Sequence, residues 1–218
     1  EEAPVNLSHV YIQVGHPGYR RPQGENASTA KDRKTVLMKG ATVRGRVVGP
    51  DGQPVAGAGV VLGDNIWGSQ PPKANTDADG AFVLRNAGPG ASSVTVQAKG
   101  FAPSVVSVVV ADGEEPPPVA VALVSGVVLR GRVVDRDGKP LAGVSVSADD
   151  WRGRRTINFR MTTDAEGRFE WKNAPRDTVT FRVGRGGFMS LSNVPLTASD
   201  KEHVVVLATK LSVSGSVV

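Results

Sequence analysis

A long stretch of this chain occurs twice. VRGRVVGPDGQPVAG begins at Val43, and LRGRVVDRDGKPLAG begins at Leu129. Two shorter pairs keep nearly the same spacing: TDADGAF at Thr76 with TDAEGRF at Thr163, and VQAKGF at Val96 with VGRGGF at Val183. Solenoid and propeller repeats of about 20 to 50 residues cannot bury a core alone, whereas a repeat of about 85 residues can. The sequence therefore predicts two independent domains in tandem.

The edges of the repeat define four parts of the chain. The complete units are residues 41–125 and 126–210. VGHPGY at Val14 matches VGRGGF of the second unit, and TVLMKGATVRGRVV at Thr35 matches VVLATKLSVSGSVV at Val205. We therefore expect residues 1–40 to hold the last three strands of a preceding unit, near 10–14 and 36–38. Residues 211–218 are expected to be the first strand of a following unit.

Composition favours strands over helices. The chain has 39% hydrophobic and 5% aromatic residues, with 26 Gly and 15 Pro, which suits short strands joined by tight turns. It has no cysteine, so it can form neither a disulfide framework nor a thiolate site. No apolar run reaches the length of about 18 residues that a membrane-spanning helix needs. These features predict a globular all-β chain with no direct insertion into a membrane.

Turn and strand signals recur in order within each unit. The segments GPDGQP and DRDGKP join Asp-Gly to a proline, which predicts a turn after the first strand. Val94 and Val96 alternate with polar residues, as do Val179, Phe181 and Val183, which is typical of a half-buried strand. We count seven strands in each unit. Seven strands without helical periodicity favour a two-sheet antiparallel β-sandwich.

In these motifs and their order, the chain resembles the carboxypeptidase-regulatory-like family. The matching segments are GRVVGPDGQPVAGAGV, TDADGAFVL and KGF in the first unit, and GRVVDRDGKPLAGVSV, TDAEGRFEW and GRGGF in the second. The resemblance implies a transthyretin-like (prealbumin-like, or Ig-like Greek key) sandwich related to collagen-adhesin B-type repeats. It also implies non-catalytic modules in secreted, periplasmic or surface proteins, often in tandem and sometimes beside membrane peptidases or outer-membrane receptors.

No catalytic motif accompanies these units. His9, His16 and His203 do not form a zinc-binding pattern, and the chain has neither a serine-hydrolase elbow nor a phosphate-binding glycine loop. The first strands carry Arg where an isopeptide crosslink would need Lys, and Arg does not act as an amine nucleophile. We therefore expect no enzyme activity, no cofactor and no self-crosslinking.

The acidic turns have two interpretations. Asp77, Asp79 and Gly80, with Asp164 and Glu166 in the second unit, resemble the start of a calcium loop. However, a calcium site needs six or more oxygen ligands, and no glutamate stands at the twelfth position. The pattern favours a hairpin turn stabilised by the aspartate side chain.

Candidate ligand-binding residues lie in one basic segment and one loop. The second unit carries the excess of Lys and Arg, and WRGRRTINFR interleaves aromatic side chains with arginines. Such a mixture can stack on rings and bind anionic groups; no nucleic-acid motif accompanies it. The alternative is a solvated segment whose arginines protect a sheet edge. Trp67 is a candidate for sugar stacking, or it packs on its own sandwich. The candidate residues are Trp67, Trp151, Arg152, Arg154, Arg155 and Arg160.

Three functions are compatible with these sequence features. The first is a structural spacer or protein-interaction segment of a larger secreted or membrane-anchored bacterial protein, whose partners are other domains of the same polypeptide. The second is a carbohydrate- or matrix-binding adhesion module, with a glycan or matrix protein as partner. The third is an accessory domain pair attached to a membrane peptidase or receptor. All three place the chain outside the cytoplasm and without nucleic acid.

The expected boundary at Lys210 can be tested by truncation. Strands cut from their sheets recruit new partners, so residues 211–218 should pair with the neighbouring unit or with another chain. Deleting them should leave both units folded and weaken self-association, measured by calorimetry and analytical ultracentrifugation. Loss of the second unit's melting transition would show that the final strand belongs to that unit.

Overall fold

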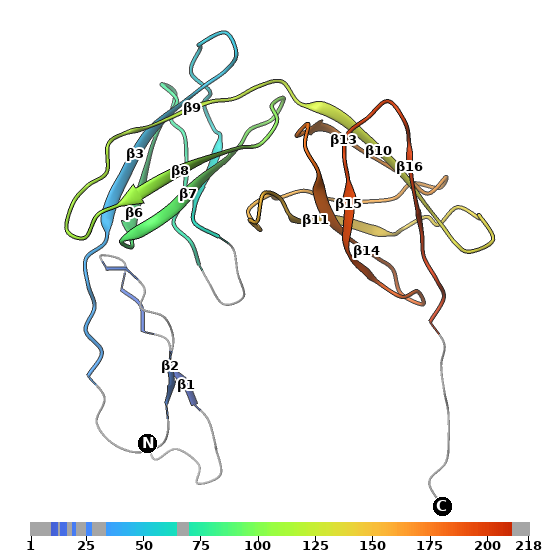
Figure 1. Ribbon diagram of the computed structural model, residues 1–218, viewed down its shortest axis with the longest axis horizontal. Coiled ribbons are helices and arrows are strands. Elements are labelled where there is room, and N and C mark those ends of the chain that lie inside the picture. The colour runs from blue at the N-terminus through green and yellow to red at the C-terminus, as the bar shows by residue number, and fades with distance from the viewer. Residues whose placement is uncertain are drawn as a thin grey trace, which may run out of the picture.

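The chain folds into two β-sandwiches, each with its own core (Figure 1). The computed structural model describes residues 10–12, 14–16, 19–20, 25–27, 34–64 and 70–210. The first sandwich contains β3 (Ala41–Val48), β4 (Gly59–Leu62), β5 (Lys73–Asn75), β6 (Ala81–Ala87), β7 (Gly90–Gln97), β8 (Ser104–Val110) and β9 (Val119–Ala122). The second contains β10 (Val127–Val134), β11 (Ser145–Asp150), β12 (Arg160–Thr162), β13 (Arg168–Ala174), β14 (Val179–Gly184), β15 (Leu191–Leu196) and β16 (His203–Val206).

The two sandwiches share one topology. A three-stranded sheet, β6-β3-β9 or β13-β10-β16, faces a four-stranded sheet, β5-β4-β7-β8 or β12-β11-β14-β15. This confirms the predicted all-β fold with seven strands in each unit. One detail was not predicted: the pairs β3–β9 and β10–β16 are parallel, while the other strand pairs in the described residues are antiparallel.

The repeated RGRVV motif places a glycine under an aromatic ring. Gly45 on β3 pairs with Phe82 on β6, and Gly131 on β10 pairs with Phe169 on β13. A Cβ atom added at Gly45 would lie 2.4 Å from Cζ of Phe82, and one at Gly131 would lie 2.3 Å from Cζ of Phe169. The glycine is therefore required because the ring occupies the space that a side chain would fill.

The acidic turns are stabilised by their first aspartate. Oδ1 of Asp77 accepts hydrogen bonds from the amides of Asp79, at 3.0 Å, and Ala81, at 2.8 Å. Oδ1 of Asp164 accepts the equivalent pair from Glu166, at 3.1 Å, and Arg168, at 2.7 Å. The carboxylates thus replace missing backbone partners in a tight turn, as expected. The turn is not a β-hairpin, however, because β5 and β6, like β12 and β13, belong to opposite sheets.

The threonine that precedes each acidic turn hydrogen bonds to the loop between the first two strands of its sandwich. Oγ1 of Thr76 accepts a hydrogen bond from the amide of Ala58, at 2.8 Å, and donates one to the carbonyl of Val55, at 2.6 Å. Thr163 makes the same two bonds with Val144 and Leu141. Both threonines are buried, so these hydroxyls satisfy backbone groups that water does not reach.

The corner that follows β7 and β14 is also repeated. Phe101 and Phe188, which the sequence aligns, form equivalent bridges to Ser125 and Thr209. The residue after this phenylalanine donates its amide to a backbone carbonyl: Ala102 donates to Val124, and Met189 donates to Ala208. Arg20, at the aligned position of the N-terminal segment, donates in the same way to Met38. The assignment of residues 1–40 to a preceding unit remains a prediction that this third occurrence supports.

The N-terminal segment contains fewer strands than expected in its described parts. β1 (Val10–Ile12) pairs with β2 (Glu25–Ala27), and this hairpin lies apart from both sandwiches (Figure 1). Residues 34–40 are described and form no strand, so the strand expected at 36–38 is absent there. The side chains of Val36 and Met38 are exposed, which indicates that no sheet covers them. Residues 211–218 lie outside the described part, so their expected strand stays a prediction.

Replacing Thr76 by Val tests the role of the buried hydroxyl. The variant keeps the side-chain shape but leaves the Ala58 amide and the Val55 carbonyl unpaired, so the first sandwich should lose about 1–3 kcal/mol of unfolding free energy. In urea denaturation of the whole chain, the unfolding transition of the first sandwich should move to a lower urea concentration, and that of the second sandwich should not change. The exposed Thr162→Val change is the matched control and should alter stability by less than about 0.5 kcal/mol. Equal effects of the two changes would contradict this role.

Candidate functional site at the junction of the two sandwiches

Residues 151–159, between β11 and β12, form the junction segment, which holds most of the candidate residues. It begins with a two-residue hairpin turn in which Arg152 and Gly153 have positive φ angles of 53° and 72°. Trp151 and Arg154 exchange backbone hydrogen bonds of 2.9 and 3.0 Å across this turn. Oδ1 of Asp150 accepts a further bond from the Gly153 amide at 3.0 Å. Positive φ at both central positions is typical of a tight hairpin, and glycine favours it.

Trp151 belongs to the core of the second sandwich. Its side chain is buried, with 2% of the residue exposed, and its Nε1 donates a hydrogen bond of 3.0 Å to Oδ1 of Asp177. The Arg152 guanidinium lies over the indole, 4.6 Å from the ring centroid, and donates to Oδ2 of Asp177 at 2.6 Å. The indole is therefore covered on both its polar edge and one face. It does not present the exposed ring that sugar stacking needs.

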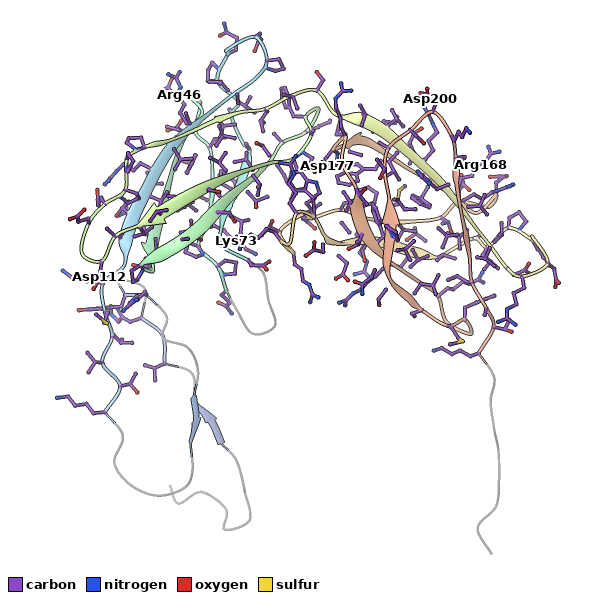
Figure 2. The ribbon with its side chains drawn as sticks, viewed as in Figure 1. Arg46, Lys73, Asp112, Arg168, Asp177 and Asp200 are labelled. Carbon is purple, nitrogen blue, oxygen red and sulfur yellow. The ribbon has the colours of Figure 1, made fainter. Side chains whose placement is uncertain are left out.

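Asp177 binds both side chains with one carboxylate. Figure 2 shows it on the side of the second sandwich that faces the first. Burial alone would raise the pKa of Asp177, but the hydrogen bonds from Arg152 and Trp151 outweigh it and hold the pKa below its ordinary value of 3.8. The carboxylate therefore stays charged while it holds Trp151 and Arg152 in place.

The other aromatic residue of the segment is also used in packing. Phe159 stacks on Trp171 with ring centroids 4.5 Å apart and meets Phe181 edge to face at 6.0 Å. Such pairs add to the free energy of apolar burial. The interleaved aromatic residues that suggested a ligand site therefore anchor the segment to its own sandwich.

The middle of the junction segment contacts the first sandwich. Oγ1 of Thr156 hydrogen bonds with Oγ1 of Thr95 on β7 at 2.8 Å. On one side of this bond, the Arg155 amide donates to Oδ1 of Asp64 at 2.7 Å. On the other side, the Asn158 amide donates to Oε1 of Gln97 at 2.8 Å, and Val105 of β8 packs against the second core.

This contact buries polar residues of β7 that would otherwise face water. Val94 and Val96 point into the first core, so Ser93 and Thr95 lie on the outer face of the sheet. Thr95 is only 1% exposed and bonds with Thr156, whereas Ser93 is 3% exposed and its Oγ has no hydrogen-bond partner among the described residues. The outer face of β7 is therefore part of the interface between the two sandwiches.

The remaining candidate residues have different surroundings. Arg154 is half-buried, and Arg155 is exposed and pairs with Asp149, with a nitrogen-to-oxygen distance of 3.9 Å. Arg160 is exposed on β12 and donates to Oγ of Ser145 at 3.2 Å. Trp67 lies outside the described residues. Ligand binding by these arginines stays a prediction.

Sequence reasoning missed the partners of the junction segment. Asp64, Thr95 and Gln97 lie in the other repeat, and Ser93, Thr95 and Gln97 alternate with valines as the exposed face of any strand does. Arg182 was also missed, although its Nε lies 3.1 Å from Oδ1 of Asp149. The one signal in the sequence was its position in the repeat, where Arg182 aligns with Thr95 of the first unit.

Two further observations concern metal binding and membrane crossing. Among the described residues, no three His, Asp or Glu side chains gather closely enough to hold a metal ion. The same residues include no helix of the length and apolar character that crossing a membrane requires.

Replacing Asp177 by Asn tests how the junction segment is held. Because the pKa of Asp177 is lowered by folding, its charge stabilises the protein at pH values above 3.8, and this contribution is lost as the pH falls further. The group is partly exposed, so we expect the variant to be destabilised by about 1 kcal/mol at neutral pH. The difference from wild type should vanish near about pH 2 in thermal unfolding. Asp112→Asn, at an exposed position, controls for the loss of one surface carboxylate, and a constant difference between Asp177→Asn and wild type at all pH values would contradict the assignment.

Comparison with known proteins places the chain in a family. A search of curated proteins finds no match. Among solved structures, a streptococcal ancillary pilin is 16% identical, with 92% of this chain and 74% of the pilin covered and a TM-score of 0.40. The minor pilin of Streptococcus agalactiae is 14% identical, with coverages of 81% and 98% and a TM-score of 0.35. The 3-chlorocatechol 1,2-dioxygenase of Rhodococcus opacus is 19% identical, with coverages of 39% and 61% and a TM-score of 0.32.

At these identities and TM-scores, the likenesses carry no argument about function. The family comparison is more direct, because the profile of the carboxypeptidase regulatory-like domain matches residues 42–124 and again residues 128–209. The two matches cover most of the chain and correspond to the two sandwiches. The chain therefore belongs to the carboxypeptidase regulatory-like domain family and contains two tandem copies of that domain.

Proposed function

We propose that this chain is a non-catalytic structural module in which two sandwiches are held in a fixed relative orientation. It serves as a spacer or protein-interaction segment of a larger secreted or membrane-anchored bacterial protein, outside the cytoplasm. The observation that carries the proposal is the buried hydrogen bond between Thr95 and Thr156, with the Asp64 and Gln97 contacts on either side of it.

These contacts are of the kind that fixes an orientation. Two domains joined by a short connection and a small polar interface normally move relative to each other. Here each of the three hydrogen bonds has its own direction, and a rotation of one sandwich that kept Thr95 and Thr156 buried would break the bond between them. Leaving a buried polar group unpaired costs about 1–3 kcal/mol. The junction therefore opposes bending, as a spacer requires.

The junction segment is also well supported on its own sandwich. Trp151 and Phe159 anchor its two ends in the second core, and Asp177 holds Trp151. Thr156 is thus presented to the first sandwich by a segment whose two ends are packed in the second core. Thr156 contacts the other sandwich. This supports a structural role for the junction segment, although the segment is rich in arginine.

Replacing Thr95 by Arg tests the proposal. A charged side chain at this buried position should separate the sandwiches without entering either core, because Thr95 points away from the first core. Small-angle X-ray scattering should then show a larger radius of gyration and a broader distribution of distances. Thr156→Arg should have the same effect from the other side.

The control is Val109→Arg, on the outer face of β8, where the side chain is 68% exposed. It should leave the scattering profile unchanged. Circular dichroism should show that the sandwiches stay folded in all three variants. A wild-type profile for both Thr95→Arg and Thr156→Arg would overturn the fixed orientation.

A further inference from the structure

The four-stranded sheet of the second sandwich has a basic outer face. Ser147 on β11 pairs with Arg160 on β12 and with Arg182 on β14, so the three residues form a row across the sheet. Val146, Phe181 and Val183 point into the core, which places this row on the side away from it. The side chains of Arg160 and Arg182 therefore extend from the same face, where Arg160 donates to Oγ of Ser145 and Arg182 pairs with Asp149.

A third arginine reaches this face from the junction segment. Arg155 and Arg182 both pair with Asp149, at 3.9 and 3.1 Å. The side chain of Asp149 is 7% exposed, whereas those of Arg155 and Arg182 are 42% and 50% exposed. The carboxylate lies beneath the guanidinium groups, which remain accessible. Asp149 pairs with two arginines, and Arg160 adds a third positive charge that pairs with no carboxylate in the described residues, so the face keeps a net positive charge.

The same face has a different character in the first sandwich. There, Val61 pairs with Lys73 and with Thr95, so the row keeps a basic residue at the position of Arg160 but has a neutral one at the position of Arg182. Thr95 is covered by the junction segment. The basic face is not equivalent to it, because a charged guanidinium at that position would not fit a buried interface between neutral hydroxyls. A second copy of the junction segment is therefore a poor partner for the basic face.

The chemistry of the face selects the class of ligand. The residues that β11, β12 and β14 direct outward are serine, threonine, arginine, aspartate and glycine. Protein interfaces have an apolar, often aromatic, core, which these side chains do not provide. Guanidinium groups instead bind sulfate and carboxylate groups with two parallel hydrogen bonds, and the hydroxyls can bind sugar hydroxyls.

We propose that the outer face of β11, β12 and β14 binds a sulfated or carboxylated polysaccharide, with Arg155, Arg160 and Arg182 as the anion-binding residues. Arg160 and Arg182 bind anionic groups along this face. Arg155 is placed beside them by its own backbone bond to Asp64 of the first sandwich. Arg152 is not part of the site, because its charge is paired with Asp177.

The experiment measures binding of three oligosaccharides of equal length to the whole chain by isothermal titration calorimetry. They are a heparin fragment, a hyaluronan fragment and a neutral dextran fragment. Wild-type protein should bind heparin or hyaluronan but not dextran, and the affinity should fall as salt is raised. The two anionic arms distinguish sulfate from carboxylate as the bound group. Failure of both to bind would overturn the proposal.

Matched variants assign the site. Arg160→Gln with Arg182→Gln should raise the dissociation constant at least about tenfold, a change of about 1.4 kcal/mol. Arg136→Gln with Lys139→Gln removes the same charge from the turn between β10 and β11 and should change it much less. Asp149→Asn should tighten binding, because it releases two guanidinium groups. Equal losses in the two double variants would show binding to the basic chain in general and overturn the site.

A single-stranded DNA oligonucleotide of matched charge is the final arm. Within the described residues, the outer face of β11, β12 and β14 presents no exposed aromatic side chain on which bases could stack, so DNA should bind more weakly than the better polysaccharide. Equal or tighter DNA binding that is lost in the Arg160 and Arg182 variant would overturn the assignment to polysaccharide. None of these variants alters Thr95 or Thr156, so failure here leaves the proposed spacer role unaffected.

Discussion

The buried hydrogen bond between Thr95 and Thr156 is the contact on which the arrangement of the two sandwiches depends. Each sandwich has a complete core of its own, so the cores alone would leave their relative orientation undecided. The threonine pair lies in a small polar interface where each hydroxyl has the other as its partner. Since an unpaired buried hydroxyl is unfavourable, the interface tolerates few other orientations. The position of Arg155 beside the basic face follows from this contact.

The two repeats share a fold but have different surfaces. The positions that build each sandwich are the same in both units, such as the glycine under an aromatic ring and the threonine before the acidic turn. The outer face of the four-stranded sheet has diverged, with Thr95 in the first unit and Arg182 in the second. Residues of the outer face do not contribute to the core, so one copy can form an interface while the other stays open and basic.

The junction segment shows how one sequence pattern can support opposite interpretations. Arginines interleaved with aromatic rings are expected of a ligand surface, but Trp151 and Phe159 pack in the second core. The difference lies in Asp177, which satisfies the indole Nε1 and pairs with Arg152. An aspartate so distant in sequence gives no local signal. Within the segment, only Arg155 lies on the face that we propose to bind anions.

The sequence by itself determined the tandem sandwiches, their turns and the matching places of Phe101 and Phe188. These depend on the alternation of apolar residues and on the chemistry of Asp, Gly and Pro in turns, which act over a few residues. The tertiary structure decided the parallel strand pairs, the burial of Ser93 and Thr95, and the row formed by Arg160 and Arg182. The reason is physical: a polar residue on the outer face of a strand looks the same in sequence whether water, another domain or a neighbouring arginine lies beside it.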